Sequence, residues 1–243
     1  MSNYKGHQMN RTDKLSRLGM GIFLTILVYG VSVFVGHRWQ LSSDFFPVSF
    51  LTHATMLLLS VGLILLLASQ VKYRFALPKP KQMIKPVCVA LLTTLVINIT
   101  LAILSFAIFG SAESHPLMEG LTPLQYVLFI LILAPIAEEH LFRGLLQNYL
   151  KPMSDKGFSL RSCRISFPVL TSAVAFSMAH LILLTAGVSP MFVIRVLVFT
   201  FFLGLIAGYY QEKYDNIAFA ILVHMTGNLM GLFSIINSGV SGV

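Results

Sequence analysis

The chain has 243 residues, of which 56% are hydrophobic and only 11% charged, and its mean hydropathy is +0.81. A soluble globular domain has about 25% charged residues. The composition therefore excludes that class and predicts a polytopic membrane protein. The net charge of +8 is attributed to loops that face anionic lipid headgroups, so lipids are expected as partners and nucleic acid is not.

Apolar runs long enough to cross a hydrocarbon core, about 20 residues each, occur seven times. They cover residues 18–36, 47–69, 86–109, 124–149, 167–184, 191–210 and 217–236. A backbone in lipid must satisfy its own hydrogen bonds, so each run is expected to be a helix. The predicted fold class is all-α, a membrane helical bundle of seven transmembrane helices, or eight if a short or broken element is hidden.

Basic residues predict the orientation of these helices. Of the 17, four precede the first run, five lie between the second and third, four between the fourth and fifth, and one follows the sixth. Fourteen basic residues therefore fall on one side, which the positive-inside rule makes cytoplasmic. We expect the N-terminus inside and the C-terminus outside.

The fourth run contains the stretch LAPIAEEHLFRGLL, and no other run contains an acidic residue. A charge at the centre of a membrane helix costs about 2.5–3.5 kcal/mol. Glu139 and Arg143 are spaced i to i+4 with the acid first, which favours an ion pair. Glu138 lies about 100° further round the helix, so it is predicted to face a polar cavity.

Pro135 lies just before these charges. Proline has no backbone N–H, so it cannot donate to the carbonyl of Leu131 in an α-helix. We expect a kink or a local opening here.

Two later runs carry further polar groups at membrane depth. The stretch FSMAH ends in His180, with Phe176 one turn before it. The stretch HMTGN places His224 and Asn228 at i and i+4, so both point the same way. Each group alone would more often be structural, but ionisable groups inside a membrane are functional by default. His53, in the second run, is interpreted as a packed polar group.

The stretches EEHLFR, FSMAH and HMTGN, in this order on successive apolar helices, resemble the CPBP family. This family comprises CAAX prenyl-protein proteases and the bacteriocin-processing or self-immunity membrane proteases called Abi proteins. The resemblance spans about 123–232. It implies a catalytic membrane core at 123–237. The predicted topology alone gives the other segments: a cytoplasmic tail at 1–17, N-terminal transmembrane helices at 18–122 and a tail at 238–243.

The resemblance also implies roles. Glu138 would be the general base that activates a water, and His180 would help to hold that water. His224 and Asn228 would donate to the developing oxyanion, and Glu139 with Arg143 would set the geometry. Amide hydrolysis needs such a base, and each oxyanion donor contributes about 3–4 kcal/mol.

No cofactor is expected to be required, and the sequence contains no HExxH. A zinc site is the alternative, in which Glu138, His180 and His224 would be the ligands.

The expected function is that of an intramembrane endopeptidase in a bacterial plasma membrane. Its substrate would be a hydrophobic, prenylated or leader peptide, or a membrane-anchored segment. Two alternatives stay open: a catalytically silent scaffold or immunity protein, and a proton-coupled transporter, although neither repeats nor matching helix breaks are found.

Overall fold

The computed structural model describes residues 10–41, 43–109, 120–160 and 163–240. Residues 1–9 and 241–243 of the two predicted tails lie outside the described residues.

Most of the described chain is helical. The elements are α1 (Arg11–Arg38), α2 (Phe50–Leu66), α3 (Pro80–Phe109), α4 (Pro123–Gln125), the π-helix η2 (Tyr126–Leu133), α5 (Ala134–Glu139), the π-helix η3 (His140–Gln147), the 3₁₀ turn η4 (Lys151–Met153), β1 (Gly157–Leu160), β2 (Cys163–Ser166), α6 (Phe167–Ala179), the 3₁₀ turn η5 (His180–Ala186), α7 (Pro190–Tyr214) and α8 (Ala218–Val240).

Five helical segments are long and apolar enough to cross a membrane: α1, α3, the segment from α4 to η3, the segment α6–η5, and α7. Two shorter apolar helices, α2 and the first part of α8, complete the set within the described residues. Each of the seven predicted runs coincides with one of these segments. The prediction of an all-α membrane bundle is therefore confirmed.

A small β-hairpin is the departure from the predicted all-α architecture. Strands β1 and β2 pair antiparallel, with Gly157 opposite Ser166 and Leu160 opposite Cys163. Gly157 has a φ of 150°, and a Cβ there would lie 2.2 Å from the carbonyl oxygen of Ile165. Only glycine allows the two strands to approach this closely.

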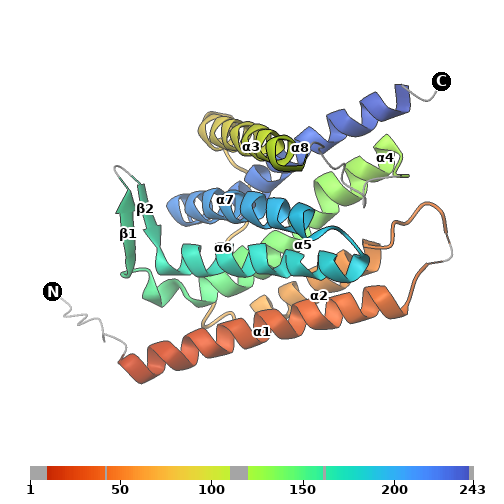
Figure 1. Ribbon diagram of the computed structural model, residues 1–243. Helices are drawn as coiled ribbons and strands as arrows, with labels where there is room; N and C mark the ends of the chain where they lie inside the picture. The colour runs from red at the N-terminus through yellow and green to blue at the C-terminus, as the bar shows by residue number, and fades with distance from the viewer. Residues whose placement is uncertain (1–9, 42, 110–119, 161–162, 241–243) are drawn as a thin grey trace.

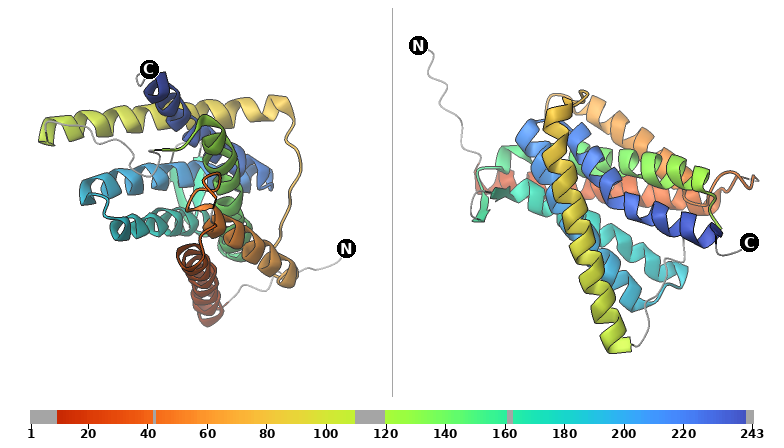
Figure 2. Two further views of the ribbon diagram at one scale, coloured as in Figure 1. Left: turned by 90° about the vertical axis from the view of Figure 1, so that its right-hand side faces the viewer. Right: turned by 90° about the horizontal axis from the view of Figure 1, so that it is seen from above.

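The segment from α4 to η3 forms the centre of the bundle (Figures 1 and 2). It packs against α1 and α2 on one side and against α6 and α8 on the other. Every residue of η3 is buried. Helices α6, α7 and α8 pack consecutively, and α3 crosses obliquely over α7 and α8. The charged stretch thus lies on the most enclosed helix.

Helix starts follow their capping residues. Asn10 Oδ1 accepts a hydrogen bond from Asp13 N at the start of α1. The hydroxyls of Ser166 and Ser189 accept from Val169 N and Phe192 N at the starts of α6 and α7. A proline stands in the first turn of both α6 and α7, where its missing N–H costs nothing.

The basic segments meet at one end of the bundle, beside the hairpin in Figure 1. Arg17, near the start of α1, donates to the carbonyls of Tyr149 and Gln70. Lys14 lies 3.7 Å from Asp155, and Lys151 pairs with Asp215 in the α7–α8 turn. The segments that the charge bias assigned to one side therefore lie together.

Asn216, in the α7–α8 turn, is hydrogen-bonded to the loop between α2 and α3. Its Nδ2 donates to the carbonyl of Ala76 at 2.7 Å, and its Oδ1 accepts from Ala76 N at 3.1 Å. Next to it, Ile217 N donates to the carbonyl of Arg74. This two-way contact joins the N-terminal helices to the last helix pair.

Replacing Asn216 by Ala leaves the Ala76 amide and carbonyl without these partners, and Asn216 is buried. We expect Asn216→Ala to lower the free energy of unfolding by about 1–3 kcal/mol, measured by denaturant unfolding in detergent. Asn98→Ala is the matched control, because the hydrogen bond that Asn98 makes among the described residues is to Thr94 O of its own helix. Equal stabilities of the two variants would contradict the role of Asn216.

Candidate active site

Glu139 is a fully buried carboxylate whose partners come from two helices. Arg143 Nη1 donates to Glu139 Oε1 at 2.9 Å, one turn along, as the i to i+4 spacing predicts. Nδ1 of His224, on α8, lies 2.8 Å from the same oxygen. The three side chains therefore form one charged cluster that joins α5 and η3 to α8.

Phe176 packs against this cluster from α6. The Arg143 guanidinium lies 4.7 Å from the centre of the Phe176 ring. The rings of His180 and His224 lie edge-on to Phe176, at centroid distances of 5.1 and 5.3 Å. Gly204 on α7 provides space for the Arg143 side chain, because a Cβ at this position would lie 2.8 Å from Arg143 Nη2.

Glu138 is less enclosed than Glu139, with 16% of its side chain exposed. His224 Nε2 lies 3.7 Å from its Oε2, and His53 Nε2, on α2, lies 3.3 Å from its Oε1. His180 is close enough to interact with the carboxylate electrostatically. Glu138 therefore faces three imidazoles from three other elements, in accordance with the predicted polar environment.

His180 stands where α6 ends and the 3₁₀ turn η5 begins. Its Nδ1 lies 3.0 Å from the carbonyl of Phe176, to which it can donate. The ring is then left with a lone pair on Nε2. Tyr29 on α1 donates to the adjacent carbonyl of Ala179 at 2.6 Å and holds this corner against α1.

Asn228 binds the main chain of η2. Its Nδ2 donates to the carbonyl of Ile130 at 3.0 Å. In η2 the Ala134 N–H donates to Phe129 O, the i to i+5 spacing of a π-helix. The same spacing would pair Ile130 O with Pro135, which has no N–H. Asn228 supplies the missing donor.

With α-helical spacing, the sequence predicted that the carbonyl of Leu131 lacks a backbone donor. In the π-helix the carbonyl without a donor is that of Ile130, one residue earlier. A single Asn228 N–H makes this bond, and a side-chain amide has two.

Five of the six predicted site residues lie together here: Glu138, Glu139, Arg143, His180 and His224. Asn228 follows His224 by one turn on α8, but its side chain bonds the main chain of η2. His53 is the neighbour of Glu138 that sequence reasoning left as a packed polar group. Its one signal was that it is an ionisable residue inside an apolar run.

The donor atoms suit a metal in type, because carboxylate and imidazole are the ligands that zinc takes. Within residues 10–41, 43–109, 120–160 and 163–240, no group of three such side chains has the spacing of a metal site.

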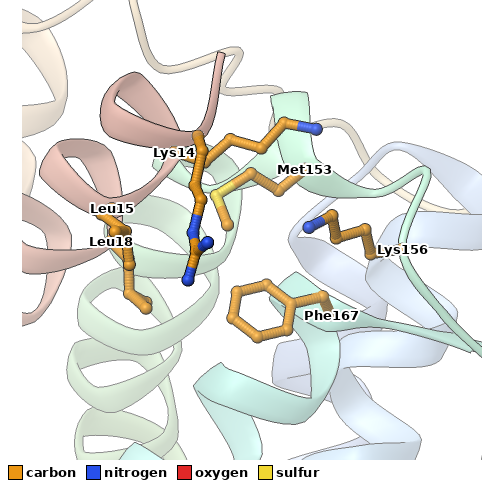
Figure 3. A pocket seen from close by; sticks show the side chains of 7 residues that line it. Lys14, Leu15, Leu18, Met153, Lys156 and Phe167 are labelled. Atoms are coloured by element: carbon orange, nitrogen blue, oxygen red, sulfur yellow. The ribbon is translucent and has the colours of Figure 1, made fainter. Parts of the chain in front are cut away.

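A cavity of about 400 Å³ opens at the basic end of the bundle (Figure 3). It is lined by Arg11, Lys14, Leu15, Leu18, Met153, Lys156 and Phe167. Phe167 begins α6 and His180 caps its end, 13 residues later. The cavity therefore lies about 20 Å along this helix from His180. It is separate from the charged site.

Comparison with known proteins gives one match. Residues 120–230 match the family described as type II CAAX prenyl endopeptidase Rce1-like. No curated protein and no solved structure matches the chain.

The matched region begins before η2 and ends beyond Asn228. It contains all three motifs on which the resemblance to the CPBP proteases was based. The match at residues 120–230 to the Rce1-like type II CAAX prenyl endopeptidases is thus consistent with the predicted CPBP family of intramembrane proteases.

Proposed function

We propose that this protein is an intramembrane endopeptidase in which Glu138 activates the attacking water. The observation that carries the proposal is the setting of Glu138: a partly exposed carboxylate surrounded by the imidazoles of His53, His180 and His224. The family match supports endopeptidase activity. The identity of the base and of the substrate is our proposal.

In this mechanism the two glutamates have different tasks. Glu138 takes a proton from a water molecule, and the water oxygen attacks the peptide carbonyl. His180 holds that water through Nε2, which remains an acceptor when Nδ1–H donates to Phe176 O. Glu139 is fully buried and its Oε1 is bonded to Arg143 and His224, so we assign it the orientation of His224 and not the activation of water.

His224 and Asn228 are the proposed oxyanion donors. With Nδ1–H donated to Glu139, His224 needs a second proton on Nε2 to donate to the oxyanion. Glu138, Glu139 and Arg143 together carry one net negative charge, which this imidazolium balances. The second N–H of Asn228 is the other donor. Each donor is expected to contribute about 3–4 kcal/mol to the transition state.

We propose that the substrate is a hydrophobic peptide anchored at the membrane, with a prenylated C-terminal peptide as the first candidate. The family description supports this choice. Leader peptides and membrane-anchored segments are the alternatives. A catalytically silent scaffold or immunity protein, or a proton-coupled transporter, would use the same fold without cleavage.

The test of the mechanism is cleavage by purified protein in proteoliposomes. An internally quenched, farnesylated C-terminal peptide should be cleaved by the wild type. Glu138→Gln, His180→Ala and His224→Ala should each lose activity because they remove the base, the water acceptor and an oxyanion donor. Glu212→Gln is the matched control, because Glu212 binds Ser166 away from the site.

Comparison of membrane peptides from cells with the wild type and with Glu138→Gln would identify the natural substrate. We expect a peptide set that accumulates only with the variant. Unchanged peptides together with a persistent biological effect would favour the scaffold, and full activity of Glu138→Gln would reject the mechanism.

We propose that no metal is required. If zinc were bound, Glu138, His180 and His224 would hold it, and it would supply a water that ionises near neutral pH. Dialysis against a chelator should leave peptide cleavage unchanged. Loss of cleavage, restored by adding back zinc but not magnesium, would show that the metal alternative is correct.

The proposed orientation puts the basic end of the bundle in the cytoplasm. In a Cys88→Ser background, exposed Cys163 on the hairpin should react with a membrane-impermeant maleimide only after the cells are permeabilised. In a Cys88→Ser/Cys163→Ser background, a cysteine replacing Gln40, in the α1–α2 loop, should react in intact cells. The opposite pattern would reverse the orientation.

A further inference from the structure

His53 is the one imidazole at Glu138 that comes from outside the matched region, residues 120–230. It lies in the first turn of α2, which packs against α5. Its Nε2 is 3.3 Å from Glu138 Oε1, and only 12% of its side chain is exposed. An ionisable side chain in an apolar helix is costly, so this contact needs an explanation.

The two oxygens of Glu138 have different neighbours. Oε1 is next to His53, whereas Oε2 faces His224 on α8. A hydrogen bond donated to Oε1 limits the rotation of the carboxylate group and so restricts where Oε2 points. Oε2 is then the oxygen directed towards His224, the proposed oxyanion donor.

The ring of His53 is held differently from the other two. His180 and His224 each bond through Nδ1, to Phe176 O and to Glu139. His53 Nδ1 is buried and has no hydrogen-bond partner among the described residues. The one protein hydrogen bond that its ring makes is therefore the contact with Glu138, so the side chain serves the carboxylate and not the packing of a neighbouring backbone.

We propose that His53 is a positioning residue of the active centre: its Nε2–H donates to Glu138 Oε1 and leaves Oε2 free to accept the proton of water. This inference rests on the proposed function, since it acts through Glu138. It also means that the N-terminal helices contribute a side chain to the site, although the three sequence motifs all lie in the C-terminal half.

The proposal makes a distinction that a purely structural role would not make. A glutamine amide nitrogen occupies roughly the place of imidazole Nε2, whereas an asparagine amide nitrogen occupies that of Nδ1. His53→Gln therefore keeps the donor at Glu138, but His53→Asn and His53→Leu do not. His37→Leu, at the exposed end of α1, controls for loss of a histidine.

The experiment measures kcat and KM for the farnesylated, quenched peptide in proteoliposomes, with the melting temperature of each variant. His53→Leu and His53→Asn should lower kcat by about 10- to 100-fold, as expected when a reacting group is misplaced. KM should change by less than about threefold, because substrate binding is untouched. His53→Gln should stay within about fivefold of the wild type, and His37→Leu should equal it.

If Glu138→Gln is inactive, three outcomes would overturn the inference about His53 alone. They are full kcat in His53→Leu, equal losses of kcat in His53→Gln and His53→Asn, and losses of kcat that parallel a fall in melting temperature. Full activity in Glu138→Gln, or no cleavage by the wild type, would instead overturn the proposed function.

Discussion

The structure depends on a single buried ion pair. Glu139 and Arg143 have almost no exposed side-chain surface, and removing two charges from water costs several kcal/mol for each ion. The neighbours offset part of that cost, although Glu139 Oε2 and Arg143 Nε and Nη2 have no hydrogen-bond partner among the described residues. His224 bonds the shared oxygen of Glu139, Phe176 stacks on the guanidinium, and Gly204 leaves the space. The pair thereby fixes how α6, α7 and α8 meet the central helix, and it sets the orientation of His224.

Features determined by neighbours in sequence were predictable. The lengths of the apolar runs gave the seven helices, because a membrane imposes one length scale on every span. The spacing of Glu139 and Arg143 predicted their bond, since residues four apart share a helix face. The family match confirms the resemblance that the three motifs indicated, and the distribution of lysine and arginine anticipated that four segments would meet at one end.

Features that depend on contacts between distant segments were not predictable. His53 and Glu138 are 85 residues apart, and nothing around His53 marks it as more than one polar residue in an apolar helix. The change of hydrogen-bond spacing in η2 is equally hidden, because a π-helix has no composition of its own. It becomes intelligible only when Asn228, 98 residues further on, is seen to bond Ile130. The hairpin formed where a charged loop was expected, through the close approach at Gly157.

The local nature of the Glu139–Arg143 bond bears on how the chain enters a membrane. Helices are made in order, and His224 is synthesised 85 residues after Glu139. During that interval the central helix must tolerate its charges without α8. Because Arg143 is one turn from Glu139, the helix carries its own counterion and can be inserted by itself. Glu138 has no such neighbour and depends on groups from other helices. The emerging helix can therefore hold the charges of Glu139 and Arg143 in lipid, whereas the surroundings of Glu138 are complete only after α8 has docked.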